Sequence, residues 1–406
     1  MTAARIVILA LAVAGALIRP FRMPAFMAPI VCAVVAVSSG LVSLQRATDS
    51  LRPLMAPLGF LLAAIPLAVL LDRFGYFEQV AARFGSGRLL VPGLWLLGAG
   101  TVAVLNLDAA VVLLTPLYVR IARHQGRSAR YLGFQPVLLA LLASSFLPVS
   151  NLTNLIVVAR YKLVPWQFLE HLALPGLAAC SLGFLLYRLV GKDTAFQAFD
   201  EPRGPIVSES RRDTRVLATG SVLVVLVLAG FLAGPSRGVA EWEVALGADV
   251  VLCLLTRRLP WRTIPWRTAL LAAGLGVLAA AATVDLHLGG LLSGDGTLAY
   301  LREAALSGAG ANVVNNLPAL LVSLPALSNG VGHASCSVWP VLWGVNSGPG
   351  LLVTGSLASL LWVDAMGRLG EPVGAGGFLK VGARVVLPSA IVGLALLVAL
   401  APAVGC

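Results

Sequence analysis

Asp108 is the residue of this chain whose type and position most strongly suggest chemistry. It follows Asn106 and Leu107 in the middle of the mostly apolar stretch 87–120. An ionisable side chain inside such a stretch is costly, so it is usually functional or held by a partner. Two interpretations stay open: Asp108 binds a proton or a cation, or its carboxylate caps the helix that follows. The first makes Asp108 a candidate for proton coupling.

Neutral polar side chains interrupt three further apolar stretches, at 131–163, 303–330 and 336–366. Pro148 accompanies the amides in the first, and Gly348, Pro349 and Gly350 accompany them in the third, so the helices are predicted to break there. A break frees backbone N–H and C=O groups, which at membrane depth only a polar cavity or a protein contact can satisfy. The side chains predicted to bind a solute at these interruptions are Asn151, Thr153, Asn154, Asn312, Asn315, Asn316, Asn346, Thr354 and Ser356.

A second carboxylate, Asp249, lies within the apolar stretch 239–256 and competes with Asp108 for the proton-coupling role. Alternatively, it pairs with a neighbouring helix. The sequence contains no phosphate-binding GxxxxGK[ST], nucleophile elbow or HExxH pattern, and its histidines and cysteines are scattered. It therefore predicts no metal, no cofactor and no ATP hydrolysis within this chain.

The composition requires lipid as the solvent for much of the chain. Of the 406 residues, 58% are hydrophobic and only 12% are charged, too few to cover a soluble protein of this size. The net charge of +11 could suggest nucleic acid, but Lys and Arg lie in short loops between apolar runs. We therefore expect a lipid bilayer, and not nucleic acid, as the partner.

Apolar runs long enough to cross a bilayer recur along the whole chain. They predict an all-α, polytopic transmembrane protein of about 10 spans plus two re-entrant helical hairpins. The charged segment 191–215 divides the chain into halves, 1–190 and 216–406. Each half has three spans, an interrupted hairpin, a broken helix and a final span. This order predicts two inverted-topology transmembrane repeats joined by a cytoplasmic linker.

The distribution of positive charge predicts the orientation. With this topology, 22 of the 29 Lys and Arg residues fall on one side of the membrane. Positive residues concentrate in cytoplasmic loops, so we expect the N-terminus outside and the linker inside a bacterial inner membrane. The first hairpin then opens to the cytoplasm and the second to the outside.

These motifs resemble the ArsB-type arsenite permeases of the ion transporter superfamily, which also includes citrate transporter-like carriers. The most specific stretch is Gly348-Pro-Gly-Leu-Leu-Val-Thr-Gly-Ser-Leu-Ala358, close to the family's GPNLSVTGSLA. Residues 315–319 and 150–154 are also similar. The chain departs from the family pattern at Leu107, where the family has Asn before Asp, and at Gly350, where it has Asn.

The resemblance implies a secondary transporter that exports arsenite or antimonite in exchange for protons, in some members with help from a separate ATPase. The sequence suits a small, neutral, arsenous acid-like solute, because the predicted interruptions contain no Lys or Arg. Two alternatives stay open: a carrier of an organic or inorganic anion, and a sodium/proton antiporter. A homodimer is also left open.

Overall fold

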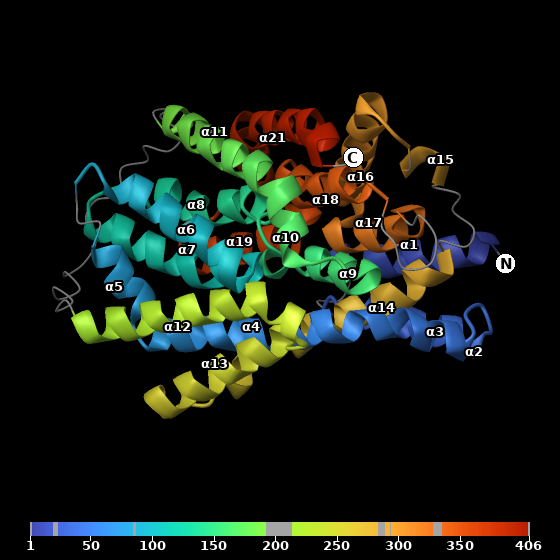
Figure 1. The fold of residues 1–406 in the computed structure, drawn as a ribbon, viewed down its shortest axis with the longest axis horizontal. Helices are drawn as coiled ribbons and strands as arrows, with labels where there is room; N and C mark the ends of the chain where they lie inside the picture. The colour runs from blue at the N-terminus through green and yellow to red at the C-terminus, as the bar shows by residue number, and fades with distance from the viewer. Residues whose placement is uncertain are drawn as a thin grey trace.

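The computed structural model describes residues 2–18, 23–83, 87–191, 213–282, 289–292, 294–327 and 335–404. Within these ranges every regular element is a helix, as the sequence predicts. By length and composition, four described helical segments can cross a bilayer unbroken: Leu44–Arg73, Pro165–Val190, Thr214–Ala233 and Ala375–Ala403. Shorter apolar helices pack among them (Figure 1). The chain is an all-helical, multi-pass membrane protein.

The elements follow one another in two similar series. The first is α1 (Thr2–Ile18), α2 (Met27–Ser38), α3 (Leu44–Leu51), α4 (Met55–Arg73), α5 (Tyr76–Ala82), α6 (Leu90–Leu105), α7 (Leu107–His124), α8 (Ala129–Leu142), α9 (Leu152–Tyr161), α10 (Pro165–Phe168) and α11 (Leu174–Val190). The second is α12 (Thr214–Ala233), α13 (Glu241–Thr256), α14 (Trp266–Ala282), α15 (Gly289–Leu292), α16 (Thr297–Val314), α17 (Asn316–Ser323), α18 (Val338–Ser347), α19 (Leu357–Arg368), α20 (Ala375–Val381) and α21 (Leu387–Leu400).

The last helix of each series contains the same irregularity. A π-helical turn, Leu169–Ala173, joins α10 to α11, and another, Gly382–Val386, joins α20 to α21. Each is followed by a Leu-Pro pair that begins the next helix. Proline lacks an N–H and crowds the preceding turn, so a wider π turn accommodates it. The two series therefore agree in local detail as well as in order.

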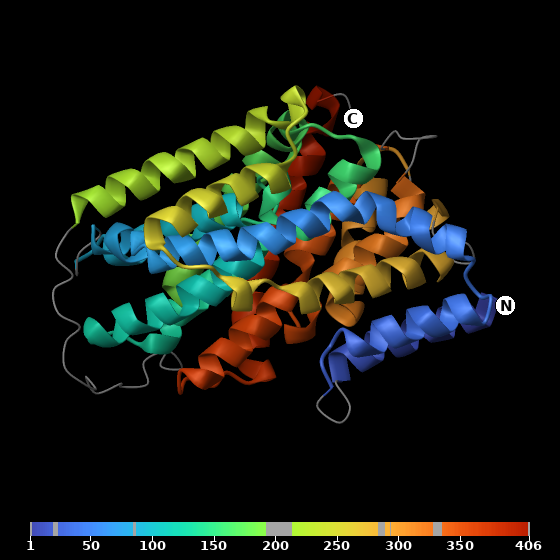
Figure 2. The same ribbon diagram turned by 90° about the horizontal axis from the view of Figure 1, so that it is seen from below.

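The two series are packed together. Helix α4 packs against α13, α2 against α14, and α11 against α21. The most buried helices are α8 and α18, the first parts of the two broken helices, whose residues are almost all inaccessible. Figure 2 shows α1 and α2 as a pair alongside α14, whereas α12 and α13 lie on the outside. The core therefore surrounds the two broken helices.

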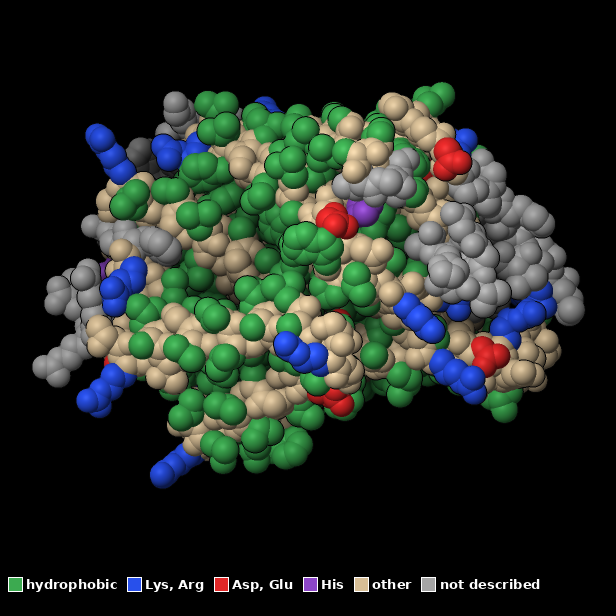
Figure 3. All heavy atoms as spheres, in the orientation of Figure 1, with side chains coloured by type: hydrophobic (Ala, Val, Ile, Leu, Met, Phe, Trp, Pro, Cys, Tyr) green, Lys and Arg blue, Asp and Glu red, His purple; other side chains and the backbone are tan. Residues whose placement is uncertain are grey.

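The surface agrees with a bilayer environment. Hydrophobic side chains cover much of the face shown in Figure 3, and many of the basic side chains lie toward its two ends. Helix α12, for example, exposes Val222, Val225 and Leu226. Exposed apolar side chains on long helices are expected where lipid is the solvent.

Two boundaries differ from the sequence prediction, and a third segment is not described. The apolar run 24–43 is long enough in sequence to cross a bilayer, yet it contains a helix of only 12 residues, α2, about 18 Å long and too short to cross a ~30 Å core alone. The second hairpin begins earlier than predicted, because α16 starts at Thr297. Of the predicted linker 191–215, residues 192–212 lie outside the described ranges.

Candidate transport site

Both hairpin turns are made by an asparagine in the same unusual backbone conformation. Asn106, between α6 and α7, has φ 86° and ψ 149°, and Asn315, between α16 and α17, has φ 79° and ψ 153°. Positive φ is uncommon outside glycine, and asparagine tolerates it better than most residues. Each side-chain oxygen accepts a backbone N–H of the next helix, from Asp108 at 2.9 Å and from Leu317 at 3.3 Å. The two turns are built alike.

Asp108 is the second residue of α7 and does not cap it. The cap is Asn106, so the alternative in which the Asp108 carboxylate caps the helix is wrong. Asp108 is buried, and its Oδ1 has no hydrogen-bond partner among the described residues. A helix N-terminus favours negative charge, whereas exclusion of water opposes it. The carboxyl can therefore take a partner that the described fold does not supply.

The first break separates α8 from α9 and is held by its own polar side chains. Pro148 begins a single 3₁₀ turn, after which Asn151 caps α9 by accepting the N–H of Thr153 at 3.2 Å. Asn154 Nδ2 donates to two carbonyls of the segment after α8, at 2.8 and 3.0 Å. These bonds satisfy groups that the break leaves free. Asn154 thus supports the backbone.

The second break, between α18 and α19, is held by Asn312 of the second hairpin. Its Oδ1 accepts the N–H groups of Leu351 and Leu352 at 3.3 and 3.0 Å. Its Nδ2 donates to the Gly348 carbonyl at 2.6 Å. Ser356 caps α19 with its hydroxyl oxygen. The second break is therefore fixed to the hairpin beside it.

Asn346 joins the two breaks. Its Oδ1 accepts from Asn151 Nδ2 at 2.8 Å and from Thr153 Oγ1 at 2.7 Å. Its Nδ2 donates to Asn154 Oδ1 at 2.7 Å. All four side chains are buried, where unpaired amides would be costly. The same Nδ2 also donates to Ser145 Oγ at 3.3 Å, so one asparagine of the second half pairs with four polar side chains of the first.

A cavity of about 60 Å³ lies where the hairpin turns meet the breaks. The first residues of α7, α9, α17 and α19 all line it. A helix N-terminus presents unpaired N–H groups and a partial positive charge. The lining includes no Lys or Arg among the described residues, and its polar side chains are Asp108, Asn151, Thr153, Thr268, Asn315 and Asn316. Twelve of the 18 lining residues are apolar, so the cavity is a mostly apolar space with six polar side chains and no Lys or Arg among its described lining residues.

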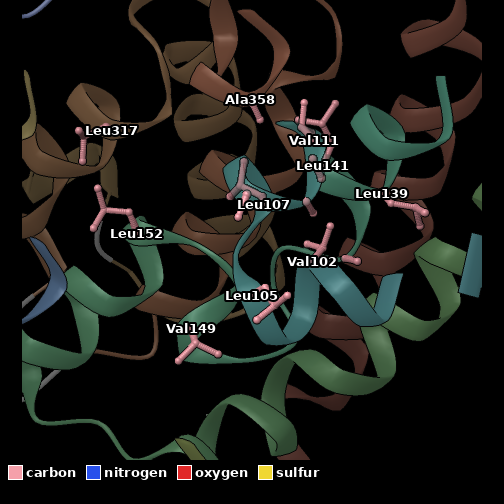
Figure 4. Packing of buried hydrophobic residues seen from close by; sticks show 14 of the residues in the cluster. Val102, Leu105, Leu107, Val111, Leu139, Leu141, Val149, Leu152, Leu317 and Ala358 are labelled. Carbon is pink, nitrogen blue, oxygen red and sulfur yellow. The ribbon is translucent and has the colours of Figure 1, made fainter. Parts of the chain in front are cut away.

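Leucines form part of the cavity wall. Leu107, Leu152 and Leu317 line it from the first hairpin, the first break and the second hairpin. Figure 4 shows these leucines with the apolar side chains that surround the first hairpin turn, including Leu105 and Val149. All five are buried. This packing holds the turn next to the break.

The predicted site residues divide into three groups. Those that line the cavity are Asp108, Asn151, Thr153, Asn315 and Asn316. Those that hold the backbone or one another, and do not line it, are Asn154, Asn312, Asn346, Thr354 and Ser356. Asp249 lies apart on α13, which packs against α4, and its buried Oδ1 has no partner among the described residues. The structure does not bring Asp249 to the cavity.

The sequence prediction missed two residues of the site, Asn106 and Thr268. Asn106 was identifiable, because aligning the two hairpin turns places it opposite Asn315. Thr268 lines the cavity from the first turn of α14. It follows Trp266 and Arg267 at an ordinary start of a span, so no local pattern singles it out.

Comparison with known proteins identifies the family. Residues 1–345, most of the chain, match the family model described as CitMHS, citrate transporter. The chain belongs to the citrate transporter family. Membership makes it a membrane transporter rather than an enzyme, and the apolar helices agree. It carries a small solute across a lipid bilayer.

Individual relatives agree with this family. The chain is 26% identical over 361 residues to the "Arsenical pump membrane protein" of Escherichia coli K12, covering 83% of this chain and 84% of the relative. It is 25% identical over 394 residues to the protein of the same name from Yersinia enterocolitica, covering 90% and 91%. An uncharacterized transporter of Mycobacterium tuberculosis is 26% identical over 367 residues, covering 80% and 82%. The similarity supports a multi-pass bacterial membrane protein.

Proposed function

We propose that this chain exports arsenite or antimonite in exchange for protons. The observation that carries the proposal is the cavity, in which helix N-termini, amides and hydroxyls surround one carboxylate, Asp108. A neutral hydroxide such as As(OH)₃ has hydroxyl groups that accept from N–H groups and donate to amide oxygens. Relatives named as arsenical pump membrane proteins support the same solute.

The size and charge of the cavity favour a small neutral solute. About 60 Å³ is room for a few water molecules or a solute of similar size. A citrate ion is larger, and its carboxylates would stand close to Asp108, where like charges repel. The described lining has no Lys or Arg to offset that repulsion.

An anion carrier is the second candidate, since the family model is described as a citrate transporter. Converging helix N-termini also stabilise anions. A sodium/proton antiporter would use Asp108 as a cation ligand. Proteoliposomes loaded with arsenite, with citrate or with sodium separate the three, because only the true solute should exchange.

Asp108 is the proposed coupling group because it lines the cavity and its buried Oδ1 has no hydrogen-bond partner among the described residues. A carboxyl that binds solute and proton in turn exchanges one for the other. Asp249 is the competing group, but it does not line the cavity, so proton binding at Asp249 would have to act on solute binding through the intervening helices. Variants of both residues distinguish them.

The two halves, residues 1–190 and 216–406, are proposed to be inverted repeats joined by a cytoplasmic linker at 191–215. The repeated order of elements supports this proposal. In it, the first hairpin opens to the cytoplasm and the second to the outside of the bacterial inner membrane.

Contacts at the helix ends agree with that orientation. At the end of α7, Arg123 donates to the Leu369 carbonyl at 2.6 Å and pairs with Glu371 at 3.1 Å, so two loops assigned to the cytoplasm meet. Tyr161, at the end of α9, donates to the Leu324 carbonyl after α17, where two loops assigned to the outside meet.

Arsenite accumulation in everted vesicles tests the function. Vesicles from an arsenite-hypersensitive bacterial host that expresses this chain should accumulate arsenite when the lumen is acidic. Collapse of the pH gradient should abolish the accumulation. The assay without ATP also tests whether a separate ATPase is needed, and cross-linking of the purified protein tests for a homodimer.

A further inference from the structure

Glu303 is a buried carboxyl for which the proposed transport cycle has so far given no role. It lies on α16, the first helix of the second hairpin, and is fully inaccessible to solvent. Its Oε1 accepts a hydrogen bond from Ser337 Oγ at 3.1 Å, at the start of α18. Its Oε2 has no hydrogen-bond partner among the described residues. Half of this carboxyl is therefore free.

The surroundings of Glu303 contain little charge. Helices α15, α17, α18 and α21, which pack against α16, carry no ionisable side chain in their described ranges. The charged groups that act on Glu303 are Arg302, its exposed neighbour, and Asp295, in the segment before α16. These two groups have opposite charges. The α18 side of Glu303 supplies only a hydroxyl.

Helices α16 and α18 approach each other closely in the part of their contact that follows Glu303. One helical turn further along, a Cβ on Gly344 would lie 2.1 Å from Ser307 Oγ, and a Cβ on Gly348 would lie 2.5 Å from the Gly308 Cα. Small residues let helix backbones approach this closely in membranes. Closing the hairpin against α18 therefore removes water from the interface that contains Glu303.

We propose that Glu303 binds a proton taken up from the outer side, and that the second hairpin closes against α18 only when that proton is bound. An ionised carboxylate without a matching cation is costly to bury, whereas a protonated carboxyl loses far less hydration. The proton therefore binds the closed conformation better, and acid on the outer side shifts the population toward closure. Glu303 would make closure of the outer gate depend on outside pH.

This inference rests on the proposed function and on the outward orientation of the second hairpin. If Glu303 had only a structural role, glutamine could replace it, because glutamine keeps the hydrogen bond from Ser337 and stays neutral at every pH. If Glu303 binds the proton, glutamine cannot replace it, because closure would no longer depend on pH. This difference defines the test.

The test is exchange of labelled arsenite across everted vesicles, whose lumen faces the original outer side. Exchange has no net driving force, so it reports the rate of opening and closing. Lumen pH is varied while external pH is fixed. In the wild type the rate should change with lumen pH by about tenfold, within the usual range of coupling between two ligands. In the Asp108→Asn background, where the carboxyl at the cavity no longer titrates, Glu303→Gln should exchange at a rate that does not depend on lumen pH.

Two variants serve as controls. Glu303→Asp retains a titrating carboxyl and should keep a pH-dependent rate, and Glu170→Gln, an exposed carboxyl on α10–α11, should match the wild type. A wild-type pH profile in Glu303→Gln, or dependence on external rather than lumen pH, overturns the proposal. If Glu303→Gln does not fold, loss of pH dependence in Glu303→Asp overturns it.

Infrared spectroscopy of the purified protein separates this inference from the proposed function. A protonated Glu303 gives a carboxylic acid C=O band, which Glu303→Gln or Glu303→Asp should remove or shift. If the wild type exchanges no arsenite but shows this band, the solute assignment fails and the proton site stands. If arsenite exchanges and the band is absent, only the inference about Glu303 fails.

Discussion

Asn346 Oδ1 accepts a hydrogen bond from Asn151 Nδ2 at 2.8 Å, and this bond joins the broken helix of one half to that of the other. The same oxygen also accepts from Thr153. Two donors that line the cavity are thus oriented by one side chain behind it. Their positions depend on Asn346, although Asn346 itself does not line the cavity.

Replacing Asn346 with alanine should therefore impair both stability and transport. The change leaves Asn151 and Thr153 without their shared acceptor, and each buried group left unpaired costs about 1–3 kcal/mol. We expect a lower unfolding temperature in detergent and a strong loss of arsenite accumulation. Thr48→Ala, which removes an exposed hydroxyl bonded within its own helix, is the control and should change neither. An Asn346→Ala protein as stable and active as the wild type would show that the link between the breaks is dispensable.

The hairpin turns should tolerate glycine better than alanine. At Asn106, alanine must adopt the strained positive φ, which destabilises the fold by about 1–3 kcal/mol. Glycine adopts this φ without strain and loses only the hydrogen bond that caps α7, which costs about a few tenths of a kcal/mol. At Asn315, glycine should be less well tolerated, because Asn315 Nδ2 also donates to the Thr354 carbonyl at 3.1 Å. Thermal unfolding of the four variants measures this order. Equal effects of glycine and alanine at Asn106 would contradict it.

Cysteine labelling tests the orientation of the two halves. In a background without the native cysteines, His124→Cys lies at the end of α7 and Ser236→Cys lies between α12 and α13, both at exposed positions. A membrane-impermeant thiol reagent added to intact cells should label Ser236→Cys and spare His124→Cys. Everted vesicles should give the opposite pattern. Labelling of His124→Cys in intact cells would reverse the proposed topology.

The sequence was informative about where the helices are interrupted. Polar residues such as Asp108 and Asn315 are surrounded in sequence by apolar residues. Because placing a polar side chain in lipid costs free energy, their positions indicate the interruptions without knowledge of the fold. For the same reason the turns of the hairpins and the breaks in the helices were predicted at the correct places, although the start of the second hairpin was not. Element order follows from such local signals.

Side-chain direction within each break was not predictable. Thr153 and Asn154 are adjacent, yet Thr153 lines the cavity whereas Asn154 holds backbone carbonyls. Both lie in the first turn of α9, and which of them faces the cavity depends on how the unwound segment before that helix orients it, which no periodicity encodes. The need for glycine at position 350 was not predictable either, because it comes from a tertiary contact: a Cβ there would lie 2.5 Å from the Val386 side chain.

The central claim, that Asp108 couples solute movement to protons at the cavity, is tested most directly by comparing Asp108→Asn with Asp249→Asn. Both variants, at matched protein levels, are assayed for arsenite accumulation in everted vesicles driven by a pH gradient. Asp108→Asn keeps the shape and hydrogen-bonding capacity of the side chain but cannot release a proton. We predict that it loses accumulation while retaining solute exchange, and that Asp249→Asn stays active. Normal accumulation by Asp108→Asn together with its loss in Asp249→Asn would contradict the account and move the coupling site to α13.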